Sequence, residues 1–342
     1  MLDSQTLMFR EAQEAPDVVA RQHAANAALI AEVAERLKSL NPHAVVTLAR
    51  GSSDNAATYA KYLIETRLGT LTSSAAPSVS SVYSAKANLK GTVLIATSQS
   101  GKSPDIVTAL QAAKQAGAFT IAFFNVTDSP LANEADVAIA LHAGPEKSVA
   151  ATKSYLATVA GIAQLVAAWA GDSALTEALT RLPDLMTRAW GLDWSKAAER
   201  LINARDLYVI GRGVGFGAAQ EAALKFKETC SLHAEAFSAA EVRHGPMALA
   251  KDGFPALILS QSDETRAGVK ELVDALAASG AEILLAGFDD PRARVLPTVD
   301  ADPALQPILM LQSFYRMAEQ LSRARGFNPD SPPLLNKVTE TI

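Results

Sequence analysis

The chain has 342 residues, of which 49% are hydrophobic, and this length favours two domains, each with its own core. Its 31 lysine and arginine residues against 36 aspartate and glutamate residues give a formal net charge of −5, which argues against a nucleic-acid-binding protein. Cys230 is the only cysteine, so an internal disulfide is excluded and a reducing compartment, the cytoplasm, is expected.

The sequence also argues against a secreted or membrane protein. The N-terminal residues show neither the basic n-region nor the apolar h-region of a signal peptide. The most apolar segment, residues 155–170, is too short to span a bilayer and contains Gln164. We therefore expect this segment to form a buried or interface helix.

Strands alternate with helices along the first half of the chain. The predicted elements are a helical segment at 6–39 divided by Pro16, a strand at 44–49, a helix ending at 65, a loop at 72–81, a strand at 92–97, a helix ending near 117, strands at 119–124 and 137–141, and a helix at 152–170. This alternation is typical of an α/β fold with a doubly wound parallel sheet between two layers of helices.

The second half repeats this plan after a helical connector at 171–200 that Pro183 breaks. The predicted elements are a strand at 207–210, a glycine-rich turn and helix, a strand at 256–259, a helix at 266–278, a strand at 282–286, a proline-rich stretch and a helix at 304–325. Gly51 is followed by Ser98-Gln99-Ser100 at nearly the distance that separates Gly211 from Ser260-Gln261-Ser262. These two spacings predict an internal duplication of one α/β domain.

A serine-rich turn follows the strand at 92–97. Ser103 is a good N-cap with Pro104 at the first helical position, and a helix N-terminus offers free N–H groups and partial positive charge. Ser98, Gln99, Ser100 and Ser103 could therefore hold a phosphate, together with Ser52 and Ser53 after the neighbouring strand. Ordinary capping and turn chemistry is the alternative.

The second glycine-rich turn, Gly211-Arg212-Gly213-Val214-Gly215, does not indicate dinucleotide binding. It lacks the GxGxxG spacing, and no acidic residue ends a following strand at the expected distance. We reject NAD as a cofactor and expect no metal.

Three charged residues of the following helix, Glu221, Lys225 and Glu228, share one face at about 100° per residue. On spacing alone, a solvated surface ion pair of Glu221 and Lys225 is the favoured explanation. However, the strand, the glycine-rich turn, this charged face and His244 in an expected turn together indicate the edge of an α/β active-site crevice.

The chain resembles double sugar isomerase (SIS) domain proteins, and specifically the isomerase half of glutamine–fructose-6-phosphate aminotransferase. The motifs that carry the resemblance are Glu11-Ala12-Gln13-Glu14-Ala15-Pro16, Gly51-Ser52-Ser53, Ser98-Gln99-Ser100-Gly101, Val149-Ala150-Ala151-Thr152-Lys153, Ala223-Leu224-Lys225-Phe226-Lys227-Glu228, His244-Gly245-Pro246 and the tail 330–337. The implied organisation is an N-terminal helical segment at 1–31, SIS domains at 32–171 and 195–329, a helical connector at 172–194 and an active-site tail at 330–342.

The resemblance implies a role for each matched position. Glu228 would move a proton between C1 and C2, Lys337 would form an imine with the ketose carbonyl, and Lys225 would assist. His244 would open the sugar ring from the other subunit of a homodimer. The sugar 6-phosphate would be bound by Gly51, Ser52, Ser53, Ser98, Gln99, Ser100, Ser103, Val149 and Ala151.

Several positions depart from the family pattern and leave the identity of the sugar open. Ala151 stands where a serine is usual, Lys102 where an acidic residue is usual, and Pro333-Leu334 where Arg-Asn is usual. No glutaminase domain precedes residue 1, so we expect no release of ammonia from glutamine by this chain.

Two classes of function follow from the resemblance. One is an enzyme: a glucosamine-6-phosphate deaminase that isomerises its substrate, a fructosamine-6-phosphate deglycase-like relative, or a plain phosphosugar isomerase. The other is a non-catalytic phosphosugar sensor, which needs only the phosphate-binding turn. The combination of Glu228, His244 and Lys337 favours the enzyme.

Overall fold

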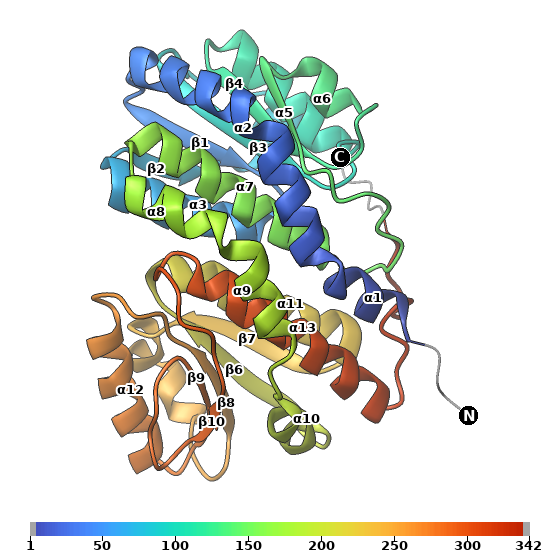
Figure 1. Cartoon of the computed structure of the whole chain (residues 1–342), viewed down its shortest axis with the longest axis vertical. Coiled ribbons are helices and arrows are strands. Elements are labelled where there is room, and N and C mark those ends of the chain that lie inside the picture. Colours follow the sequence, from blue (N-terminus) through green and yellow to red (C-terminus); the bar gives the residue numbers. More distant parts are fainter. Residues whose placement is uncertain (1–4, 338–342) are drawn as a thin grey trace. The chain divides into compact units, whose positions relative to one another are not determined.

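The computed structural model describes residues 5–337 and divides them into two compact units (Figure 1). The first-sheet unit comprises residues 17–146, 154–180 and 336–337. The second-sheet unit comprises residues 5–16, 147–153 and 181–335. Each unit therefore contains short pieces of chain that are distant in sequence from its main segment.

The first-sheet unit contains the helices and strands of the first half of the chain, apart from the first helix. They are α2 (Ala15–Leu40), β1 (Ala44–Leu48), α3 (Ser52–Leu68), β2 (Leu71–Ser74), α4 (Pro77–Ser81), β3 (Thr92–Ser98), α5 (Pro104–Gln115), β4 (Phe119–Phe124), α6 (Pro130–Glu134), β5 (Val137–Ala140), α7 (Lys153–Ala170) and α8 (Ser173–Thr180). Proline occupies the first turn of α5, where its missing N–H costs no hydrogen bond.

The second-sheet unit contains the first helix and the second half of the chain. Its elements are α1 (Leu7–Gln13), α9 (Leu182–Trp190), α10 (Ser195–Leu201), β6 (Asp206–Gly211), η1 (Gly213–Gly215), α11 (Phe216–Cys230), β7 (His233–Ser238), η2 (Glu241–His244), η3 (Pro246–Leu249), β8 (Pro255–Leu259), α12 (Arg266–Ala278), β9 (Glu282–Ala286), β10 (Arg294–Leu296) and α13 (Gln306–Ala324).

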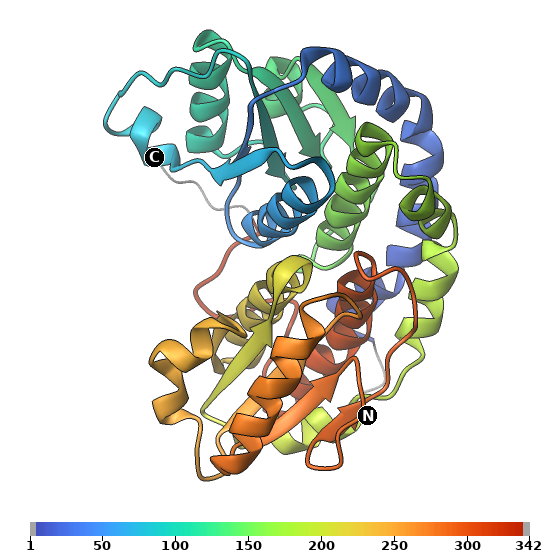
Figure 2. The same ribbon diagram turned by 90° about the vertical axis from the view of Figure 1, so that its left-hand side faces the viewer.

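The two sheets have the same topology, which confirms the predicted duplication. The first sheet has five parallel strands in the order β2-β1-β3-β4-β5. The second, taken from its β7 edge, runs β7-β6-β8-β9-β10 and is also parallel. Helices cover both faces of each sheet (Figure 2), so the predicted three-layer α/β fold is confirmed.

The central strands are covered on both faces, which explains their continuous apolar runs. All six residues of β4, Phe-Thr-Ile-Ala-Phe-Phe, are buried, and so are all five of β8. The core of the first unit joins β3 and β4 to α5 through residues such as Leu94, Phe124 and Ile106. In the second unit, α12 packs on the sheet through Val269, Leu272 and Leu276.

Three strands were not predicted. The segment 72–81, expected to be a loop, contains β2 and the short helix α4, and the sequence pattern also missed β7 and β10. All three are edge strands, and β5, the other edge strand of the first sheet, was predicted. Because an edge strand is partly exposed, it lacks the apolar run that marks a central strand; only one of the four residues of β2 is buried.

No helix within residues 5–337 combines the length and the apolar character needed to cross a membrane.

Candidate active site

The turns after β1 and β3 lie together at the carboxyl ends of these two neighbouring strands of the first sheet. The two strands are parallel neighbours, with Leu48 paired to Ala96 near their carboxyl ends. In this strand order the chain leaves β1 toward β2 and later returns to the other side of β1 at β3, so this edge is the topological switch point where α/β folds bind ligands. Thr97 Oγ1 donates to the backbone carbonyl of Ser53 at 3.1 Å and ties the two turns together.

The serine turn, residues 98–103, requires glycine at position 101. Gly101 has φ +62°, and a Cβ at this position would overlap the buried Oγ of Ser129. The N–H of Gly101 donates to Ser98 Oγ at 3.1 Å, and the N–H of Lys102 donates to Ser100 Oγ at 3.3 Å. The turn therefore keeps its hydroxyl groups close to the start of α5.

Ser103 occupies the N-cap of α5, as predicted, but its hydroxyl makes no capping hydrogen bond. Ser103 is half-buried, and Pro104, the first residue of the helix, is exposed. The buried carboxylate of Asp105 in the first turn accepts from Arg50 Nε and Nη2, each at 3.0 Å. The guanidinium of Arg50 thus lies just after the end of β1, beside the two turns.

Asp54 lies in the first turn of α3, next to Ser53. Burial raises the pKa of the Asp54 carboxyl above its ordinary value, while the nearby Arg50 acts in the opposite direction.

The corresponding turn of the second unit is filled by its own side chains. Gln261 Nε2 donates to the Arg212 carbonyl at 2.7 Å and to Asp263 Oδ2 at 2.8 Å. Asp263 Oδ1 accepts from the Thr265 N–H at 3.0 Å, and the Ser262 N–H donates to Gln306 Oε1 at 2.7 Å. Two backbone donors of this turn are therefore already occupied, and the carboxylate of Asp263 lies within it.

Helix α11 places a buried lysine between two carboxylates. The side chains of Lys225 and Glu221 are 0% exposed, and Lys225 Nζ lies 3.5 Å from Glu221 Oε1 and forms a closer ion pair with Glu228. Tyr315 Oη donates to Glu221 Oε1 at 3.1 Å. The alternative of a solvated surface pair is therefore wrong for Glu221 and Lys225, because α13 packs on this helix. Glu228 is the member that reaches the surface, with a side chain 21% exposed.

His244 ends the short helix η2 and is exposed, as the predicted turn requires. Gly245 follows it with φ +133°, a conformation that L residues rarely adopt, and the carbonyl of Pro246 accepts from Tyr208 Oη at 3.0 Å. The turn is thereby fixed to the strand β6.

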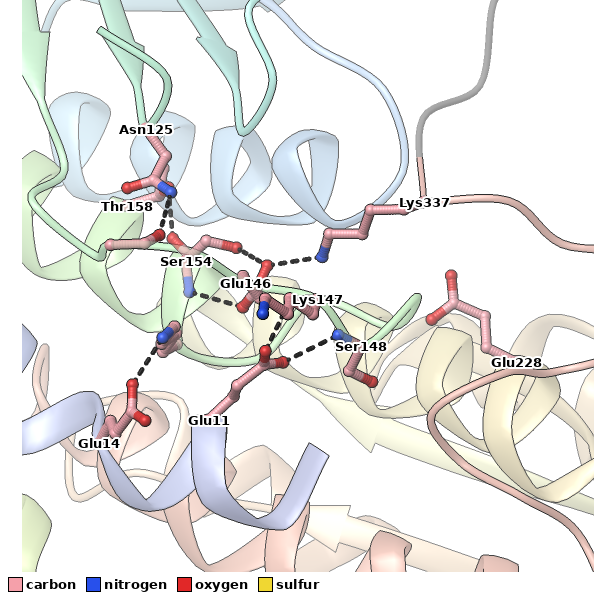
Figure 3. A network of polar contacts seen from close by, with 12 residues as sticks. Glu11, Glu14, Asn125, Glu146, Lys147, Ser148, Ser154, Thr158, Glu228 and Lys337 are labelled. Atoms are coloured by element: carbon pink, nitrogen blue, oxygen red, sulfur yellow. Dashed lines mark hydrogen bonds and ion pairs between the residues drawn. The ribbon is translucent and has the colours of Figure 1, made fainter. Parts of the chain in front are cut away.

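Helix α1 holds the segment that carries Val149 and Ala151 (Figure 3). The buried carboxylate of Glu11 accepts the backbone N–H groups of Lys147 and Ser148 at 2.5 Å and 3.1 Å. Glu14 pairs with Lys153 Nζ at 2.6 Å at the end of the same segment. The motif around Glu11 thus acts structurally, on the loop 147–153.

The tail lysine is held by a carboxylate that the sequence analysis did not identify. Lys337 Nζ lies 2.9 Å from Glu146 Oε2 (Figure 3), and its side chain is 22% exposed. A solvated tail lysine would be far more exposed than this. Glu146 could have been found as the acidic residue at the start of the loop that leads into the Val149–Lys153 motif.

These contacts arrange the predicted site residues in groups. In the first-sheet unit, Gly51, Ser52 and Ser53 adjoin the serine turn, and Lys337 pairs with Glu146. In the second-sheet unit, Lys225 pairs with Glu228, and Asp330 holds Val149 through a hydrogen bond from the Val149 N–H to the Asp330 carbonyl at 3.2 Å.

The SIS domain family model matches residues 40–168, which contain the first sheet, and residues 200–290, which contain the second sheet except β10. The chain belongs to the SIS domain family. It is 31% identical over 350 residues to the isomerizing glutamine–fructose-6-phosphate aminotransferase of Thermococcus kodakarensis, a match that covers 96% of this chain and 57% of the aminotransferase. The chain spans about half the length of the curated relatives it matches, and the resemblance to their isomerase half is confirmed.

Solved structures of the SIS family have the same fold. A candidate phosphosugar isomerase from Silicibacter pomeroyi DSS-3 is 42% identical with a TM-score of 0.91, over 95% of this chain and 100% of that chain. The C-terminal domain of glucosamine-fructose-6-phosphate aminotransferase from Francisella tularensis has a TM-score of 0.87 at 24% identity, over 96% and 99% of the two chains. At that identity the second likeness shows the fold alone.

Replacing Lys225 by methionine tests the buried ion pair of this SIS protein. Lys225→Met leaves the carboxylate of Glu221 buried without its cation, so we expect the free energy of unfolding to fall by about 3–5 kcal/mol. Lys227→Met on the exposed face of the same helix is the matched control, with an expected change within about 0.5 kcal/mol. Urea unfolding followed by circular dichroism measures both, and equal losses would show that Lys225 has no special role in stability.

Proposed function

We propose that this chain is an enzyme that interconverts the aldose and ketose forms of a sugar 6-phosphate and releases an amino group from C2. The specific reaction is the conversion of glucosamine 6-phosphate to fructose 6-phosphate and ammonia. The observation that carries the proposal is the buried Lys225 between Glu221 and Glu228. Burying charged groups costs stability, so a buried charged cluster with one member at the surface is a candidate functional site.

The serine turn supplies the phosphate-binding half of this proposal. Hydroxyl groups of Ser98, Ser100 and Ser103 lie at the N-terminus of α5, a 12-residue helix whose partial positive charge favours an anion. Gln99 and the turn Gly51–Ser53 come from the same sheet edge. A sugar 6-phosphate bound here would be anchored by the group farthest from its reacting carbons, which leaves C1 and C2 free for chemistry.

The catalytic half of the proposal is implied by the family resemblance, and the residue types fit it. Glu228 would take the proton from one of C1 and C2 and return it to the other, as a partly exposed carboxylate can do. His244 would assist ring opening, Lys337 would form an imine with the ketose carbonyl, and Lys225 would hold Glu228 in place. Val149 and Ala151 would line the sugar. A sensor would need the serine turn but not a buried ion pair.

The amino group of the substrate sets the direction of the reaction in an assay. When ammonium is dilute, mass action favours release of ammonia from glucosamine 6-phosphate. A deglycase-like reaction on fructosamine 6-phosphate would use the same phosphate turn and the same imine, and a plain isomerase would use the turn and Glu228 without ammonia release.

Substituting one serine in each turn tests the phosphate site. Ser100→Ala should weaken binding of glucosamine 6-phosphate about tenfold or more, because a hydrogen bond to a charged group contributes about 1.5–3 kcal/mol. Ser262→Ala, in the filled turn of the second unit, is the matched control and should leave the dissociation constant unchanged. Isothermal titration calorimetry on both variants decides, and an unchanged affinity in Ser100→Ala would remove this turn from the site.

Incubation with glucosamine 6-phosphate tests the reaction itself. We expect ammonia and fructose 6-phosphate in equal amounts, and borohydride added with fructose 6-phosphate should fix a reduced adduct on Lys337, located by peptide mass spectrometry. Glu228→Gln should lower turnover by about 10²–10⁴-fold, since that is the usual contribution of general acid–base catalysis.

The exposed Glu235 of β7 provides a control for that variant, and Glu235→Gln should turn over at the wild-type rate. Isomerisation without ammonia release would point to the plain isomerase. Binding without any turnover or adduct would point to the sensor.

We further propose that the enzyme is a homodimer in which His244 acts in the partner's site. His244 is exposed, and Leu249 at the end of the adjoining η3 is 63% exposed, so this region presents both polar and apolar surface. Neither Glu228→Gln nor His244→Ala should be active alone. Mixed dimers of the two variants would contain one intact site and should recover part of the ammonia release, whereas no recovery after verified subunit exchange would place His244 in its own subunit's site.

A further inference from the structure

A buried carboxylate in the first-sheet unit is directed at the tail lysine. The side chain of Glu146 is 0% exposed, and its Oε2 accepts from Lys337 Nζ at 2.9 Å. The same oxygen accepts from Ser154 Oγ at 2.7 Å, and Oε1 accepts from the Ser154 N–H at 3.1 Å (Figure 3). Both carboxylate oxygens are therefore fixed by Ser154, whatever the position of the lysine.

The environment of Glu146 favours its ionised form. Ser154 lies in the first turn of α7, a helix of 18 residues, so the carboxylate accepts a hydrogen bond at the positive end of the helix dipole. Two hydrogen bonds at one helix start stabilise a negative charge that burial would otherwise make costly. Lys337, with 22% of its side chain exposed, is the more accessible partner of the pair. The carboxylate is thus the fixed member and the lysine the member that can move.

We propose that Glu146 positions Lys337 and accepts its proton when the lysine attacks a ketose carbonyl. This inference rests on the proposed imine at Lys337. An ammonium group has no lone pair for attack, so one proton must leave before the carbon–nitrogen bond can form. The carboxylate oxygen at 2.9 Å is within direct transfer distance of that proton.

The protons and bonds of the step balance without any other reactant. Glu146 takes one proton from the Lys337 ammonium, and the free amine adds to the carbonyl carbon. The carbonyl oxygen leaves as water with the two hydrogens of the amine, a C=N bond forms, and the imine nitrogen takes the proton back from Glu146. The product is an iminium cation beside a restored carboxylate, so charge is paired at the start and at the end.

A second carboxylate of the same unit provides a matched control. Asp136 accepts from the Thr120 N–H at 2.9 Å, from Thr120 Oγ1 at 2.8 Å and from Lys114 Nζ at 2.9 Å. Like Glu146, it thus accepts from a backbone N–H, from a hydroxyl and from a lysine. Asp136 has no part in the proposed reaction, so Asp136→Asn reports the structural effect of losing such a carboxylate.

The test measures the rate at which borohydride traps fructose 6-phosphate on Lys337 in the full chain. Glu146→Gln keeps the shape of the side chain. We expect this variant to bind fructose 6-phosphate with wild-type affinity but to form the adduct about 100-fold more slowly than the wild type. Asp136→Asn should form the adduct at the wild-type rate. A Glu146→Ala variant should be slow as well, and added formate should accelerate it by supplying the missing carboxylate.

The results separate this inference from the proposed function. Adduct formation in the wild type with an unchanged rate in Glu146→Gln would overturn the role of Glu146 alone. No adduct in the wild type would overturn the imine at Lys337 and this inference with it. If Glu146→Ala stays slow at every formate concentration while its thermal unfolding matches that of Asp136→Asn, Glu146 has only a structural role and the inference fails.

Discussion

Carboxylates that accept backbone N–H groups hold the irregular parts of this protein in place. A buried carboxylate is costly unless its oxygens are occupied, and the N–H groups of loops and helix starts are costly unless they find an acceptor. Pairing the two removes both costs. Glu11 does this for residues 147 and 148, and Glu146 does it for Ser154 at the start of α7. Asp330 does the same at the other end of α1, where it accepts from the N–H groups of Leu7 and Met8 at 2.7 Å each. The segments that carry Val149 and precede Lys337 are thereby fixed without regular secondary structure.

The duplicated domains show how one topology serves two purposes. Both sheets have a turn after the equivalent strands, β3 and β8, at the same switch point of the strand order. In the first copy the turn retains half-buried hydroxyl groups and glycine at position 101. In the second copy Gln261 and Asp263 bond to each other within the turn, and Asp263 also accepts from the Thr265 N–H. Since a carboxylate repels a phosphate, we expect no phosphate to bind at the second copy.

The charged face of α11 illustrates how packing changes the meaning of a sequence pattern. The spacing of Glu221 and Lys225 is common on exposed helices, where such pairs contribute a few tenths of a kcal/mol. Here both side chains are fully buried, with Tyr315 of α13 donating to Glu221. The same two residues therefore change from a minor surface contact to a buried cluster whose disruption is severe. Residue spacing does not record which helix will cover a face, so the sequence left both interpretations open.

The sequence by itself determined the fold class, the duplication and the family, because these depend on local patterns. Continuous apolar runs mark the central strands β3, β4 and β8, since parallel strands are buried on both faces. Glycine and serine at the strand ends marked the turn that we propose binds phosphate, because helix starts and positive φ angles have specific chemical requirements.

Only the tertiary structure decided which edge strands form and which charges pair. The strand β2 carries one buried residue in four, so its place in the sheet comes from pairing with β1 rather than from its own composition. Glu146 and Lys337 lie far apart in the sequence, and neither residue has a local pattern that names the other. Their ion pair exists because the fold brings the chain's tail to the loop after β5, and long-range contacts of this kind leave no periodic signal in the sequence.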